Sequence, residues 1–278
     1  MTEIKYDLHS HSHYSDGELS PTQLVLRAKE HGVNTLALTD HDTVAGLAEA
    51  QLAATEQDIN LITGIELSCE WSKKPFHILG LNIDPNNAEL LAGTQRLQVI
   101  RLERAKKIAA KLEKNKIPGA WEAVQASAGT GMITRPHFAN FLLENNHVSS
   151  IQNAFDRYLG QGKPAFVSTQ WVELENAIQW IQAAGGVAVV AHPMRYRLTA
   201  SWMRRFLAAF KEYGGEGIEV ITARSNPDEV RRVIQFAKQF ELYGSMGSDF
   251  HTPKNQWVEL GRLAPLPENI RPVWELFD

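Results

Sequence analysis

Short apolar runs alternate with amphipathic segments along most of this 278-residue chain, and this alternation limits the folds open to it. Apolar or alternating runs of roughly four to eight residues are typical of strands, whereas apolar residues at helical spacing indicate helices. Seven runs have the strand pattern, at residues 4–8, 35–39, 61–65, 77–81, 187–191, 217–221 and 242–246. Strands that alternate with helices pair in parallel through crossover helices. We therefore expect an α/β protein, and seven such units favour a barrel over an open sheet.

Three of the helices between these runs have readable boundaries. The segment Ser20–Gln23 offers an N-cap Ser, then Pro at the first helical position and Gln three residues after the cap. Asn226–Glu229 has the same arrangement. A third helix is predicted over residues 172–184, where the two glycines that follow would end it.

The alternation stops between residues 98 and 166, where helices follow one another without a convincing strand. These helices are predicted at residues 98–116, 121–128, 136–146 and 150–160. We interpret them as a helical insertion, or cap, between barrel units. The predicted domains are the first part of the barrel at 1–97, the cap at 98–166 and the second part of the barrel at 167–278.

Composition excludes several classes of protein. The single cysteine, Cys69, excludes an internal disulfide framework and a cysteine-based zinc site. No run approaches the roughly 18 apolar residues of a membrane span, and the first residues lack the apolar stretch of a signal peptide. We therefore expect a cytoplasmic protein with no membrane partner. Taken alone, the net charge of −4 argues against a nucleic-acid partner.

Imidazole and carboxylate side chains collect where the strand-like runs end. Five separate strand ends carry a His, Asp or Glu, and in a barrel such ends converge on one face. His77 fits this pattern less well, because it opens its run. The candidate ligands are His9, His11, Asp16, His41, Glu66, His77, His192, Asp249 and His251.

Such a cluster is difficult to explain without bound metal. Neighbouring imidazoles would lower one another's pKa and neighbouring carboxylates would repel, and divalent cations relieve both problems. Nine ligands suit two or three ions bridged by a carboxylate such as Glu66. A mixed imidazole and carboxylate set indicates Mn²⁺, Fe²⁺ or Zn²⁺ rather than Mg²⁺ or Ca²⁺. Adjacent ions lower the pKa of bound water from about 15.7 to about 7, so a metal-bound water is the expected nucleophile of phosphoester hydrolysis. Asp40 either supports this site through His41 or caps the next helix.

The motifs HSHYSDG, TDHDT, GIE, AHP and GSDFH resemble, in order and spacing, those of the PHP (polymerase and histidinol phosphatase) superfamily. The stretches KIPGAWE, TRPH, LGQGKPAFV, AHPMRY and WVELGR are similar to its bacterial subfamily with a helical insertion. Members of that subfamily are described as nucleoside 3′,5′-bisphosphate phosphatases and as 5′→3′ exoribonucleases that trim RNA 5′ ends, including those of ribosomal RNA.

The resemblance implies a distorted seven-stranded (β/α) barrel and up to three metals, usually Mn²⁺. One ion would be held by His9, His11, Glu66 and Asp249, a second by Glu66, His77 and His192, and a third by Asp16, His41 and His251. Phosphate-binding roles are implied for Arg135, His137 and Arg195, and the guanidinium groups of the two arginines suit phosphate geometry. A surface salt bridge is the alternative for Arg135. Arg197 and Arg224 are further candidates.

Residues 96–116 combine eight basic side chains with two acidic ones, a charge of +6, while the rest of the chain carries −10. Apolar residues at helical spacing indicate that one face of this helix packs and the other is basic. The basic face is either merely solvated or tracks a phosphate backbone. Trp121, Phe138 and Phe141 either stack on bases or pack in the core.

These features predict a metal-dependent phosphoesterase whose partners are RNA 5′ ends and small nucleotides. The leading hypothesis is a 5′→3′ exoribonuclease acting on 5′-monophosphorylated RNA. The main alternative is a nucleoside 3′,5′-bisphosphate 3′-phosphatase, and the others are a histidinol-phosphatase-like enzyme and a non-catalytic PHP module. No protein partner is inferred from the sequence.

Overall fold

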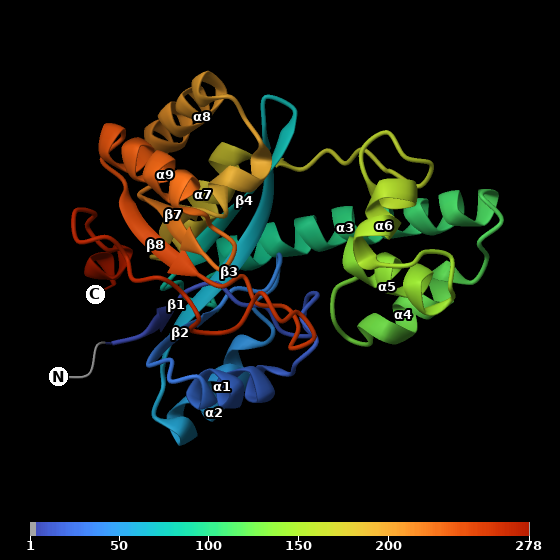
Figure 1. Ribbon diagram of the computed structural model, residues 1–278, viewed down its shortest axis with the longest axis horizontal. Coiled ribbons are helices and arrows are strands. Elements are labelled where there is room, and N and C mark those ends of the chain that lie inside the picture. The colour runs from blue at the N-terminus through green and yellow to red at the C-terminus, as the bar shows by residue number, and fades with distance from the viewer. Residues whose placement is uncertain (1–3, 278) are drawn as a thin grey trace.

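An eight-stranded sheet forms the centre of the molecule in a computed structural model that describes residues 4–277. Seven strands follow one another in the order β1-β2-β3-β4-β6-β7-β8, and β5 pairs with β3 outside this path. The strands are β1 (Tyr6–Asp7), β2 (Thr35–Leu38), β3 (Asn60–Trp71), β4 (Lys74–Leu81), β5 (Val172–Glu173), β6 (Val187–Val190), β7 (Gly217–Thr222) and β8 (Tyr243–Gly247). A parallel bridge between Ser10 and Phe250 links the two ends of the path. The sheet is therefore a nearly closed barrel (Figure 1), which confirms the predicted fold class.

The pairing along this path is parallel except at β4, which is antiparallel to both β3 and β6. β3 and β4 form a hairpin in which Trp71 pairs with Lys74 across a two-residue turn. The prediction of parallel pairing throughout was therefore wrong at this strand. The physical reason is that an apolar strand pattern reads the same in either direction, so it cannot report the orientation of a strand.

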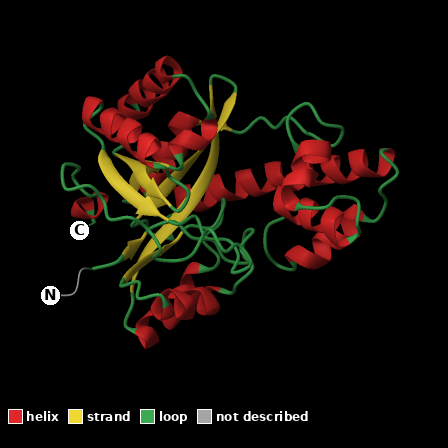
Figure 2. Ribbon diagram, in the orientation of Figure 1, coloured by secondary structure: helices red, strands yellow, loops and turns green. Residues whose placement is uncertain are grey.

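Five helices surround the barrel on two sides (Figures 1 and 2). They are α1 (Pro21–Glu30), α2 (Leu47–Gln57), α7 (Leu174–Ala183), α8 (Ala200–Glu212) and α9 (Pro227–Gln239), with short 3₁₀ turns at Pro193–Tyr196 and Val273–Leu276. The predicted N-caps Ser20 and Asn226 both form capping boxes. The helix predicted from residue 172 begins only at Leu174, because Val172 and Glu173 pair with β3. No helix in the described range is long and apolar enough to cross a membrane.

The helical segment projects to one side of the barrel (Figure 1). It contains α3 (Ala88–Lys114), α4 (Ala120–Ala128), α5 (Arg135–Glu144) and α6 (Ile151–Ala154), which continues as a π-helix over Phe155–Leu159. α3 begins earlier than predicted, where the Asn87 side chain accepts from the amides of Glu89 and Leu90. Because α3 crosses residue 97 without interruption, one helix belongs to both the barrel and the helical segment. The domain boundaries at 97 and 166 stay predictions.

Separate apolar clusters support the two parts of the chain. β6 is buried on both faces, since Val187 and Val189 pack in one cluster while Ala188 and Val190 pack in another. This double burial explains the continuous apolar run in the sequence. The helical segment has its own cluster, which includes Phe138 and Phe141 and against which Trp121 packs. These aromatic residues therefore pack in a core, which favours that alternative over stacking on bases.

Candidate active site

All nine candidate ligands converge on one end of the barrel. Glu66 lies within β3 and His77 within β4, and the loops that follow parallel strands carry the others. Those are His9, His11 and Asp16 after β1, His41 after β2, His192 after β6, and Asp249 and His251 after β8. The carboxyl ends of the parallel strands meet at one rim, and this geometry brings together residues that are far apart in the sequence.

The antiparallel orientation of β4 explains the position of His77. In a strand that runs against its neighbours, the first residues lie beside the carboxyl ends of the others. His77 therefore opens its run in the sequence and still reaches the cluster, where its Nδ1 lies 3.0 Å from Glu66 Oε1.

Glu66 is the centre of the cluster. Its Oε1 lies 3.0 Å from both His77 Nδ1 and His192 Nε2. Its Oε2 lies 2.9 Å from His41 Nδ1, 3.4 Å from His11 Nε2 and 3.5 Å from His9 Nε2. One carboxylate thus faces five imidazoles, which is the position required of a group that bridges neighbouring cations.

Asp249 and Asp16 extend the cluster in two directions. Asp249 Oδ1 lies 3.3 Å from His9 Nε2 and 3.2 Å from His11 Nε2. Asp16 Oδ1 lies 3.3 Å from His251 Nε2 and 3.8 Å from His41 Nε2. Asp249 Oδ1 also lies 3.6 Å from His251 Nδ1, so the two carboxylates share this imidazole.

The residues fit a set of bound divalent ions. His9 Nε2 and His11 Nε2 face each other at 3.1 Å, where two lone pairs would repel without a proton or a cation near them. Asp16 Oδ1, His41 Nδ1 and Glu66 Oε2 are buried without a well-oriented hydrogen bond. Buried polar atoms without partners are uncommon and indicate a missing ligand. Three groups of ligand atoms, each within 4.8 Å of one another, offer positions for such ions: His11–Asp16–His41–His251, His9–His11–Glu66 and His41–Glu66–His77.

Burial and neighbouring charges shift the pKa values of the candidate ligands in both directions. Burial, together with the nearby imidazoles, lowers the pKa of His11 to about 3, and burial lowers that of His77 to about 4. The neutral imidazole is the form that binds a metal. Against the effect of burial, neighbouring carboxylates raise the pKa values of His9 and His41, and raise that of His251 to about 9, so a metal ion would displace protons there. Although burial opposes the shift, the surrounding histidines hold the pKa values of Glu66 and Asp16 well below their usual range.

Glu219 contacts two residues of the cluster and was not predicted from the sequence. It lies in β7 and is almost fully buried. Its Oε1 lies 2.9 Å from His9 Nδ1, and its Oε2 accepts a hydrogen bond from the backbone amide of His192 at 2.5 Å. A charged residue inside the apolar run Gly217–Thr222 was the signal that could have identified it, because buried charges are rare without a purpose.

Asp40 acts on a loop rather than on His41. Its carboxylate accepts from the Ser12 amide at 2.8 Å and from the hydroxyls of Ser12 and Ser15 at 2.6 Å. Ser15 Oγ lies 3.4 Å from His11 Nδ1. Asp40 thereby fixes the loop that contains His11 and Asp16, so its contact with the cluster is indirect.

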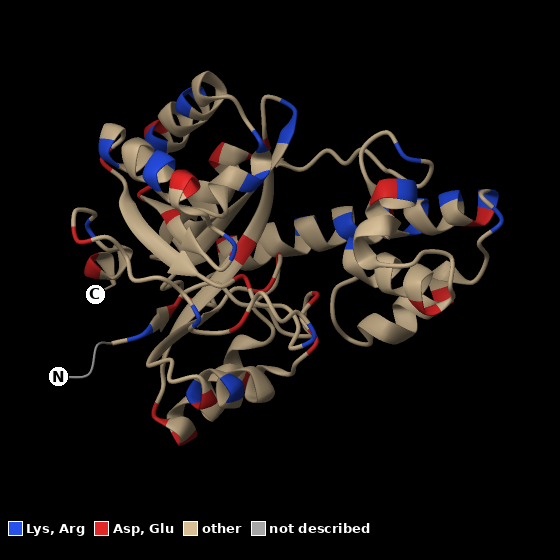
Figure 3. Ribbon diagram, in the orientation of Figure 1, with Lys and Arg blue, Asp and Glu red and all other residues tan. Residues whose placement is uncertain are grey.

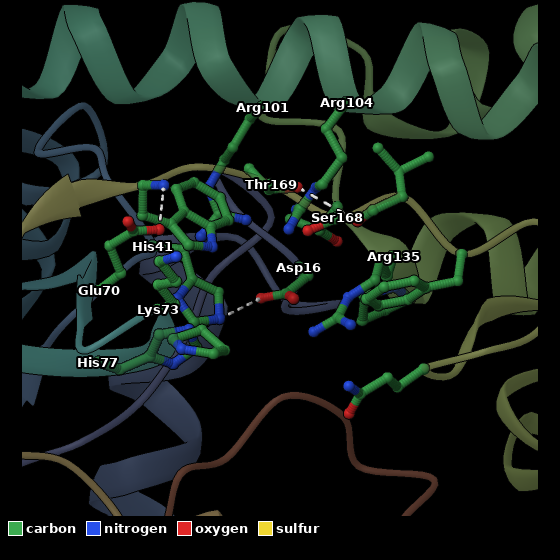
Figure 4. Close-up of a pocket in the computed structure, with 17 residues that line it drawn as sticks. Asp16, His41, Glu70, Lys73, His77, Arg101, Arg104, Arg135, Ser168 and Thr169 are labelled. Atoms are coloured by element: carbon green, nitrogen blue, oxygen red, sulfur yellow. Dashed lines mark hydrogen bonds and ion pairs between the residues drawn. The ribbon is translucent and has the colours of Figure 1, made fainter.

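A cavity of about 340 Å³ lies between the cluster and the helical segment, and we call it the cap-side cavity. Asp16, His41 and His77 form its floor, while Arg101 and Arg104 descend from α3 and Arg135 points in from α5 (Figure 4). Arg101 is bound to Asp42 at 2.5 Å and to Ser68 at 2.8 Å.

Arg104 is 8% exposed, and its guanidinium carbon lies 4.9 Å from the centre of the Trp171 ring. Among residues 4–277, no carboxylate pairs with Arg104 or Arg135. Burial and the neighbouring Arg101 lower the pKa of both groups. Two guanidinium groups without an anion therefore face the same cavity. The salt bridge considered for Arg135 is absent from the described residues.

A second cavity, of about 300 Å³, lies on the other side of the cluster, and we call it the barrel-side cavity. His192, Arg195, Arg197 and Arg224 are among its lining residues. Arg195 forms an ion pair with Asp249. The remaining phosphate-binding candidate, His137, lines neither cavity, because its Nδ1 lies 3.1 Å from the Thr134 amide in the capping box of α5.

The family profile of the PHP domain matches residues 7–223 of the chain. A protein of Haemophilus influenzae named 5′-3′ exoribonuclease is 48% identical over 98% of this chain and 99% of its own length. A protein of Chromobacterium violaceum named 3′,5′-nucleoside bisphosphate phosphatase is 41% identical over 96% of this chain and 94% of its own.

A solved structure agrees with this result. The structure described as an amidohydrolase from Chromobacterium violaceum with bound sulfate and no metal superposes with a TM-score of 0.93 at 41% identity. The match covers 98% of this chain and 96% of that one. Fold and sequence therefore lead to the same group of proteins.

Proposed function

Because the chain belongs to the PHP domain family, we propose that it is a metal-dependent phosphoesterase that removes mononucleotides from the 5′ ends of 5′-monophosphorylated RNA. Ribosomal RNA is among the substrates that we propose. We further propose that the protein acts in the cytoplasm, where these RNA ends are processed.

One observation supports this substrate: Arg104 is buried beside the ligand cluster and has no anionic partner among residues 4–277. An unpaired buried charge is costly, so a site that maintains one is built for an anion that arrives with the substrate. Arg135 faces the same cavity and adds a second positive charge. We assign this pair to the 5′-terminal phosphate, one nucleotide away from the phosphate that is cleaved. The arginine geometry suits the non-bridging oxygens of a phosphate monoester.

Divalent ions, for which we propose Mn²⁺, would be held by the nine ligands in the three groups that the resemblance implies, and would supply a water of lowered pKa and positive charge for the phosphoryl oxygens. Glu219 orients the imidazole of His9 and the backbone of His192. Asp40 holds the loop between His11 and Asp16. Arg195 lies beside Asp249, where it can bind an oxygen of the reacting phosphate.

The reaction adds water to phosphorus and breaks the bond to the 3′ oxygen of the terminal nucleotide, which takes up a proton. The released product is a nucleoside 5′-monophosphate with a free 3′-hydroxyl. The downstream chain retains the phosphate at its new 5′ end, so it is again a substrate. Binding of each new 5′-phosphate by the same two arginines favours successive removal of single nucleotides.

The position of Arg104 and Arg135 in the cap-side cavity also favours a second substrate. In a nucleoside 3′,5′-bisphosphate the 5′-phosphate and the bond to the 3′ oxygen have the same relation as in 5′-monophosphorylated RNA. Removal of the 3′-phosphate would therefore use the same leaving group and the same two arginines. The Chromobacterium violaceum relative has this activity in its name, and we propose it as the alternative function.

The test compares RNA with a 5′-phosphate, the same RNA with a 5′-hydroxyl, and a 3′,5′-bisphosphate, each with Mn²⁺. We expect mononucleotides from the phosphorylated RNA and much slower turnover of the 5′-hydroxyl RNA. Arg104→Ala should lower kcat/KM for the phosphorylated RNA by about 10- to 100-fold, the value of one lost charged hydrogen bond. Lys107→Ala, which removes an exposed charge from the same helix, is the matched control and should have little effect.

Absence of mononucleotide release would reject the exoribonuclease, and absence of phosphate release from the bisphosphate would reject the alternative. If Arg104→Ala affected the two RNA ends equally, the assignment of the cap-side cavity to the 5′-phosphate would be wrong.

A further inference from the structure

Apart from His192, Arg195 and Glu219 at its edge, the barrel-side cavity has no part in the function proposed so far. It opens between the carboxyl ends of β6 and β7, where Arg197 follows the 3₁₀ turn after His192, and Arg224 lies in the turn after Thr222. It thus lies on the same rim of the barrel as the ligand cluster, but on the side away from the helical segment.

Only one layer of side chains separates the two cavities. His77 lines the cap-side cavity and His192 lines the barrel-side cavity. Their ring centres are 5.4 Å apart, and both rings contact Glu66 Oε1 at 3.0 Å. A phosphate bound at the cluster would therefore have open space on both sides, which a chain substrate needs and a single nucleotide does not.

The barrel-side cavity carries free positive charge. Arg197 and Arg224 are exposed, and within residues 4–277 neither forms an ion pair. Two carboxylates also line the cavity, but each is hydrogen-bonded to a group other than these arginines. Glu219 contacts His9 and His192, and Glu229 accepts from the Asn226 amide at 3.0 Å in the capping box of α9. Two arginines without partners thus remain to bind an anion.

We propose that the barrel-side cavity binds the first phosphate downstream of the cleaved bond, through Arg197 and Arg224. This inference rests on the proposed exoribonuclease function and gives the RNA a direction. The 5′-phosphate lies in the cap-side cavity, the reacting phosphate lies at the cluster, and the next phosphate lies in the barrel-side cavity. A nucleoside bisphosphate has no group for this last position, so the cavity favours polynucleotides over bisphosphates.

The experiment uses three substrates of increasing length: a 3′,5′-bisphosphate, a 5′-phosphorylated dinucleotide and a 5′-phosphorylated trinucleotide. Only the trinucleotide has a phosphate beyond the one that is cleaved first. The double change Arg197→Ala and Arg224→Ala should raise KM about tenfold for the trinucleotide and leave the other two within about twofold. The slope of log KM against log salt for the trinucleotide should fall by roughly 0.7, the single-strand value for one lost phosphate contact.

The double change Arg232→Ala and Lys238→Ala is the matched control. It removes the same charge from exposed positions of α9 that do not line the cavity, and should change no KM. An unchanged KM for the trinucleotide in the Arg197/Arg224 variant would overturn the proposal. Equal rises for all three substrates would also overturn it, because the arginines would then act on the shared cluster.

The same series separates this proposal from the function on which it rests. If the unaltered protein cleaved the bisphosphate but neither oligonucleotide, the exoribonuclease function would fail and the downstream site would fail with it. If Lys107→Ala, Lys111→Ala and Lys114→Ala together raised the KM of the trinucleotide while the arginine changes did not, the strand would run along α3, and the barrel-side cavity would be excluded.

Discussion

Glu219 lies at the back of the cluster, and its carboxylate holds parts of two proposed ligands in place. In Glu219→Gln the side chain keeps its size but loses the charge that favours a protonated His9 Nδ1 and a basic Nε2 toward the metal. Changes to groups that orient metal-binding histidines typically cost about 10- to 100-fold in metal affinity. We therefore expect Mn²⁺ to bind about 10- to 100-fold more weakly, as measured by calorimetric titration of the metal-free protein.

Glu216→Gln provides the comparison for this change. Glu216 immediately precedes β7, at the opposite end from the loop that faces the cluster, so its replacement should leave Mn²⁺ affinity unchanged. Equal affinities for the two variants would contradict a supporting role for Glu219.

At the level of single residues, the sequence predicted the side chains at strand ends better than those inside strands. His9 and His192 were identified because a polar residue after an apolar run marks the rim of a barrel. Glu219 was missed because the inference considered only strand ends, although its place in an apolar run was visible. The phosphate-binding role of His137 stays a prediction, and its Nδ1 faces the Thr134 amide at the start of α5.

The hairpin of β3 and β4 shows why orientation was harder to predict than strand position. Its two turn residues, Ser72 and Lys73, have φ angles of 49° and 61°, in the left-handed region. Turns of this kind favour Asn and Gly, which are the usual sequence signals of a tight hairpin. This chain lacks both residues at the turn, so nothing in the sequence marked the reversal.

Lys73→Gly should therefore stabilise the protein. A left-handed residue with a β-carbon costs about 1 kcal/mol relative to glycine, and glycine removes that cost. The free energy of unfolding in urea should rise by roughly 0.5 to 1 kcal/mol.

The adjacent Lys74→Gly should have the opposite effect, because Lys74 begins β4 and its Nζ lies 5.5 Å from the centre of the Trp202 ring. Changes of the same sign at both positions would contradict this account of the turn.

In α3, the predicted basic face divides into two groups. Arg101 and Arg104 share the packed face with Leu97, Ile108 and Leu112, and they reach the cap-side cavity. The lysines lie farther along, where basic residues mark the distal half of α3 (Figure 3). The spacing of the two arginines within the apolar stripe was the available signal. The buried position of the two arginines was not predicted, because arginine on a helix is mostly a surface residue.

For the whole molecule, the net charge of −4 describes the substrate-binding surface poorly. The carboxylates of the cluster lie among imidazoles, while Arg104, Arg135, Arg197 and Arg224 face the two cavities and form no ion pair within the described residues. Two or three divalent ions would add roughly +4 to +6 at this point. A polyanion would therefore meet a positive rim on a weakly acidic protein, which follows from the arrangement of charges and not from their sum.

The ligand cluster also predicts how strongly metal couples to folding. Three carboxylates and six imidazoles are gathered at one rim, and within residues 4–277 several of their buried polar atoms lack a hydrogen-bond partner. Ions that bind only the folded state stabilise it by about 2.7 kcal/mol at 100 times their Kd. For a chain of this size that corresponds to a rise in Tm of roughly 5 °C per site, measured by calorimetry after chelation and titration with Mn²⁺. Mg²⁺ at the same concentration should give a smaller rise, because it prefers oxygen ligands and this cluster is rich in nitrogen.

Glu66→Gln should abolish most of the Mn²⁺ effect, since it removes the negative charge of the shared carboxylate. If Tm did not respond to Mn²⁺ in the unaltered protein, the nine side chains would have to be stabilised by protons alone, and the proposed metal centre would be wrong.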